Sequence, residues 1–182
     1  MDTLGLVEAG SIAAGVELAD FMVKAAQVEL VKAGTICSGR YMIYVAGDRE
    51  AVESSVETAR TTGRQLAGSF VISNVSPLVI SALRKNEAAG ENDALAVVEC
   101  RTVSSGIAAA DSAVKRSAVR LLKLVTGQGI NGKSYFVLCG DVAAVTEAVE
   151  AAKEALGPKL LETVGLPRPD ASVLKAVTRV AR

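Results

Sequence analysis

Residues 4–32 of the chain are LGLVEAGSIAAGVELADFMVKAAQVELVK, and residues 95–123 are LAVVECRTVSSGIAAADSAVKRSAVRLLK. The two stretches align without a gap at an offset of 91 residues. Acidic, hydroxyl and lysine positions coincide: Glu8 with Glu99, Ser11 with Thr102, Asp20 with Asp111, Lys24 with Lys115 and Lys32 with Lys123. Because an internal repeat determines the architecture, every further element is assigned within it.

A second pair of blocks continues the alignment. Residues 38–60, SGRYMIYVAGDREAVESSVETAR, match residues 131–153, NGKSYFVLCGDVAAVTEAVEAAK, at an offset of 93, so the second copy gains two residues just before Gly132. The chain is therefore a tandem duplication, with domains predicted at residues 1–90 and 91–182. Residues 85–93 between the copies are polar, contain a glycine and show no apolar period, which is typical of a linker.

Within each copy the hydrophobic period changes several times. Apolar or alternating runs predict strands at 4–8, 28–32, 40–46 and 70–73, and at 95–99, 119–123, 133–139 and 160–164. Ser11 and Thr102 are expected to cap one helix in each copy, and the Gly-Asp pairs that end the third strands precede a second helix. We expect each copy to be a βαββαβ-like α/β (α+β) domain, a small, mostly antiparallel sheet with helices packed on it.

Apolar side chains at helical spacing predict the buried faces. The stripe of the first helix is Ile12, Val16, Ala19 and Val23, matched by Val103, Ile107, Ala110 and Val114; the second helices should turn Val52, Val56 and Ala59, or Val145, Val149 and Ala152, inward. These Ala-rich units of about 90 residues are small for independent folding. Quaternary packing is expected to supply further burial.

Composition excludes several classes of function. The chain has 182 residues, 50% of them hydrophobic, and 20 basic residues balance 20 acidic ones. Disorder is excluded, and the charge balance argues against nucleic-acid binding. The absence of histidine removes the usual general base and the commonest metal ligand, which leans away from catalysis.

The cysteines and the hydropathy bear on location. Cys37, Cys100 and Cys139 show no CxxC spacing, so a disulfide framework or zinc site is not expected. Residues 1–10 lack the pattern of a secretory signal, and no apolar run is long enough to span a membrane. We therefore expect a cytosolic protein without membrane partners.

Short motifs in both copies resemble the shell proteins of bacterial microcompartments. They are Val7-Glu8, Ala19-Asp20, Val23-Lys24, Ile36-Cys37-Ser38-Gly39, Gly47-Asp48 and Leu166-Pro167-Arg168-Pro169. Their order is the ordinary one rather than the circularly permuted one. The chain is most similar to the tandem-domain propanediol-utilisation type that carries an iron–sulfur cluster.

The resemblance implies a homotrimer whose six domains form a pseudohexagonal tile of a shell in the cytoplasm. Such tiles pack edge to edge with other shell proteins around enclosed enzymes. The family's edge lysine falls on Lys24 and Lys115, and its edge arginine falls on Arg168; the first copy has Ser76-Pro77 there and lacks the arginine. From the residues alone, both lysines are better explained as solvated helix ends, and it is the repeat together with the resemblance that favours the edge role.

The resemblance also places a central pore at two glycine-rich loops. Its lining is expected from Thr35, Ile36, Cys37, Ser38 and Gly39 in the first copy and from Gln128, Gly129, Ile130, Asn131 and Gly132 in the second. Ser38 and Asn131 would form alternating neutral rings that suit small polar metabolites. From sequence alone, without the resemblance, an ordinary glycine-rich hairpin loop is the safer interpretation.

An electron-transfer protein with a cluster at the three-fold axis is the second hypothesis. The relative's cluster cysteine aligns with Gly106, so that ligand is absent, and Cys37 is the remaining candidate for an Fe–S cluster. No cofactor is expected for a structural tile.

A third hypothesis is an enzyme or a small-ligand sensor with a pocket between the copies. Glu8 and Glu99 are the best acidic candidates, but their repetition favours a structural role. The segment 127–132, GQGING, follows no strong βα unit, so it does not indicate a phosphate loop. Catalytic residues are therefore predicted to be none, and the enclosed pathway cannot be named from the sequence.

Overall fold

The computed structural model describes residues 2–84 and 93–178, and it divides into two compact units. Unit 1 comprises the chain up to Val75 together with Gln128–Asn131, and unit 2 comprises Ser76–Gly127 and the chain from Gly132 onward. The predicted linker and the domain boundary after residue 90 fall almost entirely at 85–92, outside the described residues.

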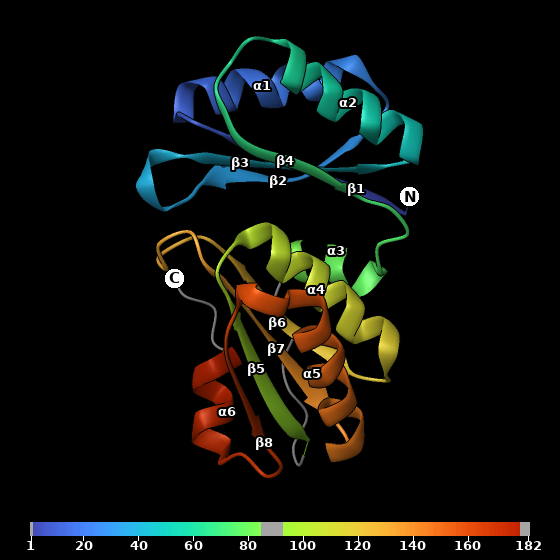
Figure 1. Ribbon diagram of the computed structural model, residues 1–182, viewed down its shortest axis with the longest axis vertical. Helices are drawn as coiled ribbons and strands as arrows, with labels where there is room; N and C mark the ends of the chain where they lie inside the picture. Colours follow the sequence, from blue (N-terminus) through green and yellow to red (C-terminus); the bar gives the residue numbers. More distant parts are fainter. Residues whose placement is uncertain (1, 85–92, 179–182) are drawn as a thin grey trace. The chain divides into compact units, whose positions relative to one another are not determined.

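Unit 1 is a four-stranded antiparallel sheet covered by two helices. The strands are β1 (Thr3–Ala9), β2 (Glu29–Thr35), β3 (Tyr41–Gly47) and β4 (Leu66–Ile72), in the spatial order β2-β3-β1-β4. The helices are α1 (Ile12–Ala25) and α2 (Arg49–Thr61), which lie on the same face of the sheet (Figure 1). A short 3-10 turn, η1 (Cys37–Gly39), joins β2 to β3.

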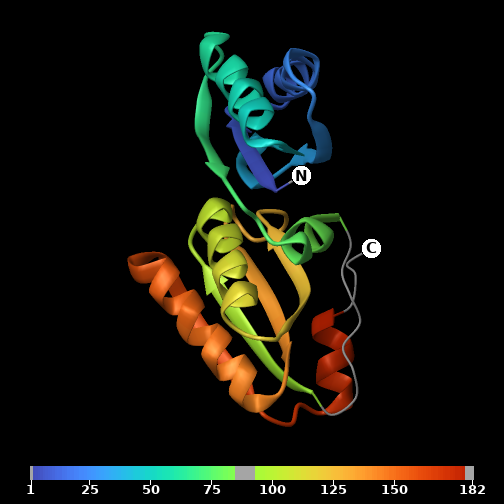
Figure 2. The same cartoon turned by 90° about the vertical axis from the view of Figure 1, so that its right-hand side faces the viewer.

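Unit 2 repeats this plan and adds two helices. Its strands are β5 (Ala94–Cys100), β6 (Arg120–Thr126), β7 (Ser134–Gly140) and β8 (Leu160–Leu166), in the order β6-β7-β5-β8. Helices α4 (Val103–Arg116) and α5 (Val142–Leu156) follow the pattern of the first copy, whereas the 3-10 turn η2 (Gly157–Lys159) lies between α5 and β8 and differs in place from η1. The added helices are α3 (Pro77–Arg84) and α6 (Ala171–Thr178); α6 lies on the opposite side of the sheet from α5 (Figure 2).

The predicted fold class is confirmed, and the elements differ from expectation mainly at their ends. Strand β4 begins at Leu66, four residues before the expected start at 70, and β2 runs on to Thr35. Helices α3 and α6 are missing from the sequence-based expectation; at eight residues each, they are too short for a helical period to stand out.

The two predicted caps are present. The Ser11 hydroxyl accepts a hydrogen bond from the Ala14 amide at 3.4 Å, and the Thr102 hydroxyl accepts one from the Ser105 amide at 3.3 Å. Each satisfies an amide that the first helical turn leaves without an intrahelical acceptor.

The second helices bury the expected side chains. Val52, Val56 and Ala59 of α2 are all 0% exposed, and Val145, Val149 and Ala152 of α5 are no more than 9% exposed. The core of unit 1 combines α2 with Val7, Leu18, Met22, Ile43 and Val45.

The predicted stripe of α1 is wrong as a description of its buried face. Ile12, Val16 and Val23 are 45%, 55% and 38% exposed, whereas Gly15, Leu18 and Met22 are buried. The reason is Gly15: a Cβ there would lie 2.4 Å from Cβ of Tyr41, so the helix meets the sheet at its glycine. Glycine contributes nothing to an apolar pattern, and the pattern therefore pointed to the other face.

The same stripe is correct for α4. Val103, Ile107 and Ala110 are 5%, 0% and 0% exposed. Among the described residues, no helix has the length and hydropathy needed to cross a membrane.

Candidate functional site

The first predicted pore loop is the connection between β2 and β3. It closes through a hydrogen bond from the Ile36 amide to the Arg40 carbonyl at 3.0 Å, and the side chain of Ile36 is only 7% exposed. Gly39 has a φ of +73° and no neighbour within 4 Å of an added Cβ, so this glycine is needed for its backbone conformation rather than for space. The Ser38 side chain, which was predicted to form a ring, lies outside the described residues.

The second predicted pore loop is longer than the first and contains more residues with a positive φ. It joins β6 to β7, and the two extra residues of the second copy lie in it. Gly127, Gly129, Asn131 and Gly132 have φ values of +85°, +73°, +55° and +75°. Asparagine is one of the few other residues that adopts this region readily.

The two loops meet within unit 1. Residues Gln128–Asn131 group with that unit, and the Gln128 side-chain amide donates to the Thr35 carbonyl at 3.3 Å. Gln128, Gly129 and Asn131 are exposed. The structure therefore brings together the two segments that the resemblance assigned to the pore, and the exposed groups of the second segment are uncharged.

The predicted edge lysines make the same ion pair in different surroundings. Lys24 Nζ lies 2.6 Å from the Asp20 carboxylate, with side-chain exposures of 72% and 53%. Lys115 Nζ lies 2.5 Å from the Asp111 carboxylate, but here the exposures are 40% and 8%. Asp111 also accepts a hydrogen bond from the Ser76 amide at 2.7 Å, so it caps the start of α3.

Arg168 is exposed just beyond β8. Strands β4 and β8 end at Ile72 and Leu166, so the structural counterpart of Arg168 is Asn74. The expected counterpart, Ser76-Pro77, is therefore two residues out of register. Asn74 has a φ of +55°, and the first copy still has no arginine at this point.

The two strand-end glutamates form matching ion pairs. Glu8 lies 2.6 Å from Arg40, and Glu99 lies 3.1 Å from Lys133. Because each pair joins the first strand of a repeat to the start of its third strand, both carboxylates tie the sheet together. A repeated structural contact supports the non-catalytic interpretation of these residues.

Gly106, the position at which the resemblance places a cluster cysteine, lies in the interior of unit 2. Gly106 is buried in α4, and a Cβ there would lie 1.9 Å from Ser134 Oγ and 3.1 Å from Cys100 Sγ. A side chain at this position would therefore enter the interior of unit 2. In the described part of the chain, no group of three or more His, Cys, Asp or Glu side chains is placed to hold a metal ion.

Two cysteines are buried and poorly reactive by their surroundings. Burial raises the pKa of the Cys100 thiol, and a hydrogen bond from Ser134 opposes this only in part. Burial also raises the pKa of Cys139, against the opposing effect of Arg120, whose guanidinium donates to its sulfur at 3.2 Å. Because the thiolate is the reactive form, both behave as packing residues, and only Cys37 is partly exposed.

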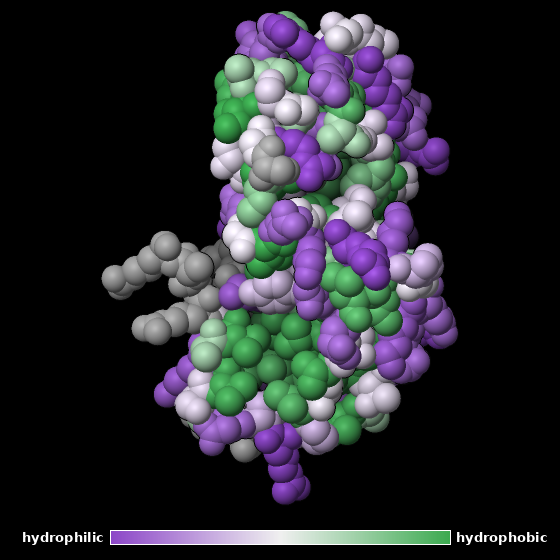
Figure 3. Space-filling view, turned by 60° about the vertical axis from the view of Figure 1, so that its left-hand side comes forward, coloured by the Kyte–Doolittle hydropathy of each residue, from purple (hydrophilic) through white to green (hydrophobic). Residues whose placement is uncertain are grey.

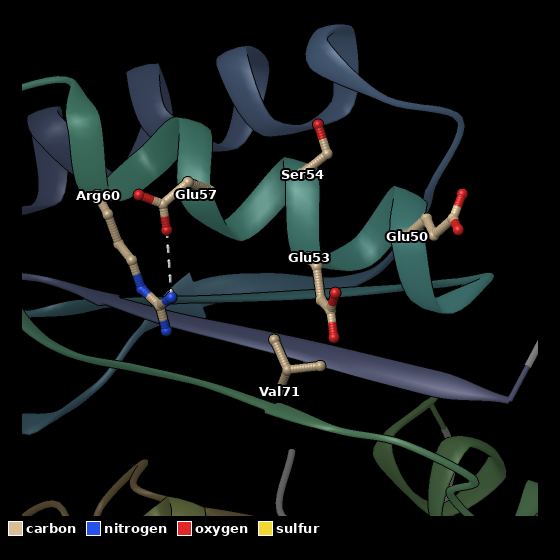
Figure 4. A pocket seen from close by; sticks show the side chains of 6 residues that line it. All are labelled: Glu50, Glu53, Ser54, Glu57, Arg60 and Val71. Carbon is tan, nitrogen blue, oxygen red and sulfur yellow. Dashed lines mark hydrogen bonds and ion pairs between the residues drawn. The ribbon is translucent and has the colours of Figure 1, made fainter.

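An open pocket of about 620 Å³ lies between α2 and β4 of unit 1. Figure 4 shows Glu53 and Arg60 pointing from α2 toward Val71 of β4, while Ser54 points away. Arg60 pairs with Glu57 at 3.3 Å and donates to Ser69 at 2.9 Å. The lining couples no nucleophile to a base, and sequence reasoning gave no signal for this pocket.

Comparisons with known proteins agree with the repeat. The BMC domain family matches residues 3–75 and 94–169. The bacterial microcompartment shell protein PduT of Citrobacter freundii is 37% identical over 173 residues, which covers 93% of this chain and 94% of that protein. The carboxysome shell protein CcmK2 of Synechococcus elongatus is 41% identical over 71 residues, 39% of this chain and 70% of that protein.

A solved structure has the same arrangement of elements. The crystal structure of a microcompartment protein from Desulfitobacterium hafniense DCB superposes with a TM-score of 0.91 at 38% identity. The superposition covers 95% of this chain and 98% of that one.

Proposed function

Since the chain belongs to the BMC-domain family of bacterial microcompartment shell proteins, we propose that it acts as a homotrimeric tile of such a shell. Its two domains are tandem copies of one fold, so three chains supply six domains around one axis. That duplication is the observation that carries the proposal, because a closed ring of repeated heterologous contacts is an ordinary solution for such units.

The proposed pore is formed by the two loops that meet in unit 1. Three copies of each loop would alternate around the axis, with Asn131 exposed and Gln128 bridging to Thr35. Neutral amides and backbone groups offer hydrogen bonds without a charge filter. We therefore assign passage to small polar metabolites, and the longer second loop makes the opening three-fold rather than six-fold.

The proposed edge contacts use Lys24, Lys115 and Arg168. A lysine stem can lie along apolar surface while its ammonium group binds carbonyl oxygens of a neighbouring tile. Partners are thus further shell proteins, with enclosed enzymes on one face of the tile, inside a compartment in the cytoplasm.

The tile is proposed to carry out no catalysis and to need no cofactor. The relatives are structural shell proteins, and the acidic pairs and the pocket described above arrange no reacting groups. The iron–sulfur alternative through Cys37 has a direct test. Iron and broad visible absorbance in anaerobically purified protein, both lost in Cys37→Ser, would establish it.

The test of the tile begins with the mass in solution. Light scattering should give three chains per particle, and electron microscopy of concentrated protein should show flat sheets. A particle that stays monomeric and never forms sheets contradicts the proposal.

Lys24→Ala tests the contact between tile edges without disturbing the fold. Both partners of its ion pair are exposed, so trimers and thermal stability should be retained while sheets are lost. Lys115→Ala is less clean, because it also uncovers the buried Asp111. Lys153→Ala, which removes a similar exposed i,i+3 pair on α5, is the matched control and should still form sheets.

A further inference from the structure

Helix α3 shows how one repeat receives a helix from the other. It follows the first copy in sequence but packs in unit 2, against β6 and α4. Val79, Ile80, Ala82 and Leu83 are 0%, 8%, 4% and 3% exposed. These four apolar positions of the eight-residue helix are therefore covered, whereas Leu78 is 39% exposed.

A polar contact fixes the start of α3. The Ser76 amide donates to the Asp111 carboxylate at 2.7 Å, and Lys115 holds the same carboxylate from the next turn of α4. The seat of α3 therefore consists of an apolar flank, formed by α4 and β6, and a carboxylate that binds the helix start.

Helix α6 is the counterpart of α3, 94 residues later, and it is only half covered. The four buried positions of α3 recur in α6 as Val173, Leu174, Ala176 and Val177. Leu174 and Val177 pack on the sheet of unit 2, but Val173 is 42% exposed and Ala176 is also exposed. Figure 3 shows hydrophobic side chains gathered at the surface of unit 2.

The counterpart of the seat, on α1 and β2 of unit 1, is exposed. Val16 is 55% exposed where Ile107 is 0%, and Leu30 is 44% exposed where Leu121 is 2%. The Asp20 carboxylate stands where Asp111 does, held by Lys24 in the same way. One chain thus has a helix, α6, with exposed apolar side chains, and a matching apolar surface on α1 and β2 that is also exposed.

We propose that α6 of one chain occupies the α1–β2 seat of a second copy of this chain. Val173 and Ala176 would cover Val16 and Leu30, and the backbone at Asp170 would meet Asp20 as Ser76 meets Asp111. The Asp170 carboxylate accepts hydrogen bonds from the amide and hydroxyl of Ser172, at 2.8 and 2.5 Å, so it is engaged by its own helix. The inference rests on the proposed trimer and specifies the contact that closes it.

A second copy is the occupant because the chain already makes this contact once. Helix and seat are repeats of a pair that fits within unit 2, and each of the two seats is apolar beside an Asp–Lys ion pair. A contact between two different patches of identical chains is heterologous, and it closes into a ring when the rotation permits.

A cysteine pair tests the geometry. Asp20→Cys with Asp170→Cys, in a Cys37→Ser background, should form disulfides between chains on mild oxidation, giving two- and three-chain bands on non-reducing gels. Glu53→Cys with Asp170→Cys is the matched control, because Glu53 lies on α2 away from the seat, and it should stay monomeric on the gel. No cross-link from the first pair in assembled protein would overturn the inference.

A charge on α6 tests the energetics. Val173→Asp should convert the trimer to monomers by light scattering while the circular dichroism spectrum is unchanged, since the residue is exposed in the single chain. Val142→Asp, at a 52% exposed site on α5, should leave the trimer intact. A Val173→Asp trimer overturns the α6 contact and leaves the proposed tile standing, whereas a wild-type monomer at every concentration overturns both.

Discussion

Helices α1 and α4 hold the same place in the two repeats, and both have fourteen residues and a hydroxyl cap. Yet α1 buries three of its residues and α4 buries seven. Unit 2 contains α3, which packs against α4, whereas the described part of unit 1 contains only α1 and α2. The comparison shows that the apolar stripe of a helix includes side chains that another element covers, as α3 does in unit 2.

The largest expected difference in the free energy of unfolding between matched variants of the two repeats is at Ile107 and Val16, in the middle of the apolar stripes of α4 and α1. Ile107→Ala should lower the free energy of unfolding by about 3 kcal/mol, because it removes a fully buried side chain and leaves a cavity. Val16→Ala, at the equivalent exposed position, should change it by less than about 0.5 kcal/mol. Urea unfolding in a Val173→Asp background, where no second copy covers α1, measures both. Equal losses would contradict the asymmetry.

The next largest difference in stability is expected at Gly15 and Gly106, the glycines at which α1 and α4 approach their sheets. Gly15→Ala should cost about 2 kcal/mol, because the new methyl group meets Cβ and the ring of Tyr41, which cannot rotate away. Gly106→Ala should cost less, since Ser134 Oγ can turn aside at the expense of its hydrogen bond to the Thr102 carbonyl. Thermal unfolding compares the two, and Gly106→Ala with Ser134→Ala should recover part of the loss.

The two Asp–Lys pairs should differ by a smaller amount. Asp111→Ala leaves the Ser76 amide without its acceptor in a buried site and should cost about 1.5 kcal/mol. In the Val173→Asp background, where no second copy covers Asp20, Asp20→Ala removes an exposed i,i+4 pair and should cost about 0.3 kcal/mol. Repeating the urea unfolding in high salt supplies the control: the Asp20 effect should disappear, and a persistent effect would contradict its assignment as a surface pair.

The helix caps should show the smallest difference between the repeats. Ser11→Ala and Thr102→Ala each remove one hydroxyl acceptor at the start of a helix and should each cost about 1 kcal/mol. Helix content and urea unfolding give the measurement. A much larger loss for Thr102 would indicate that its contacts with the Ser104 and Ser105 hydroxyls also contribute.

Much of the fold could be predicted because the repeat doubled every signal. Ser11 and Thr102, or Val56 and Val149, hold equivalent places in the two copies, so the caps and the inward stripes of α2 and α5 were assigned correctly. The exposed stripe of α1 could not be assigned, because the determining residue, Gly15, is defined by the space it leaves against Tyr41.

The candidate site was predictable as segments but not as contacts. The glycines of 127–132 marked a loop, while the hydrogen bond from Gln128 to Thr35 joins residues 93 positions apart and has no local signature. Likewise, Gly106 was recognised as the residue in the cluster position, but only the structure shows that a side chain there would meet Ser134.

The chain passes from unit 1 to unit 2 at Ser76, before the first copy ends, and this affects how the chain can be divided. Since α3 belongs to unit 2, a cut after Arg84 would give a first fragment that carries a helix whose packing partners, β6 and α4, are on the second fragment. The two polypeptides should then associate, because the eight residues of α3 on the first fragment would pack against β6 and α4 on the second. The packing of α3 in unit 2 thus joins the two halves non-covalently, in addition to the peptide chain that connects them.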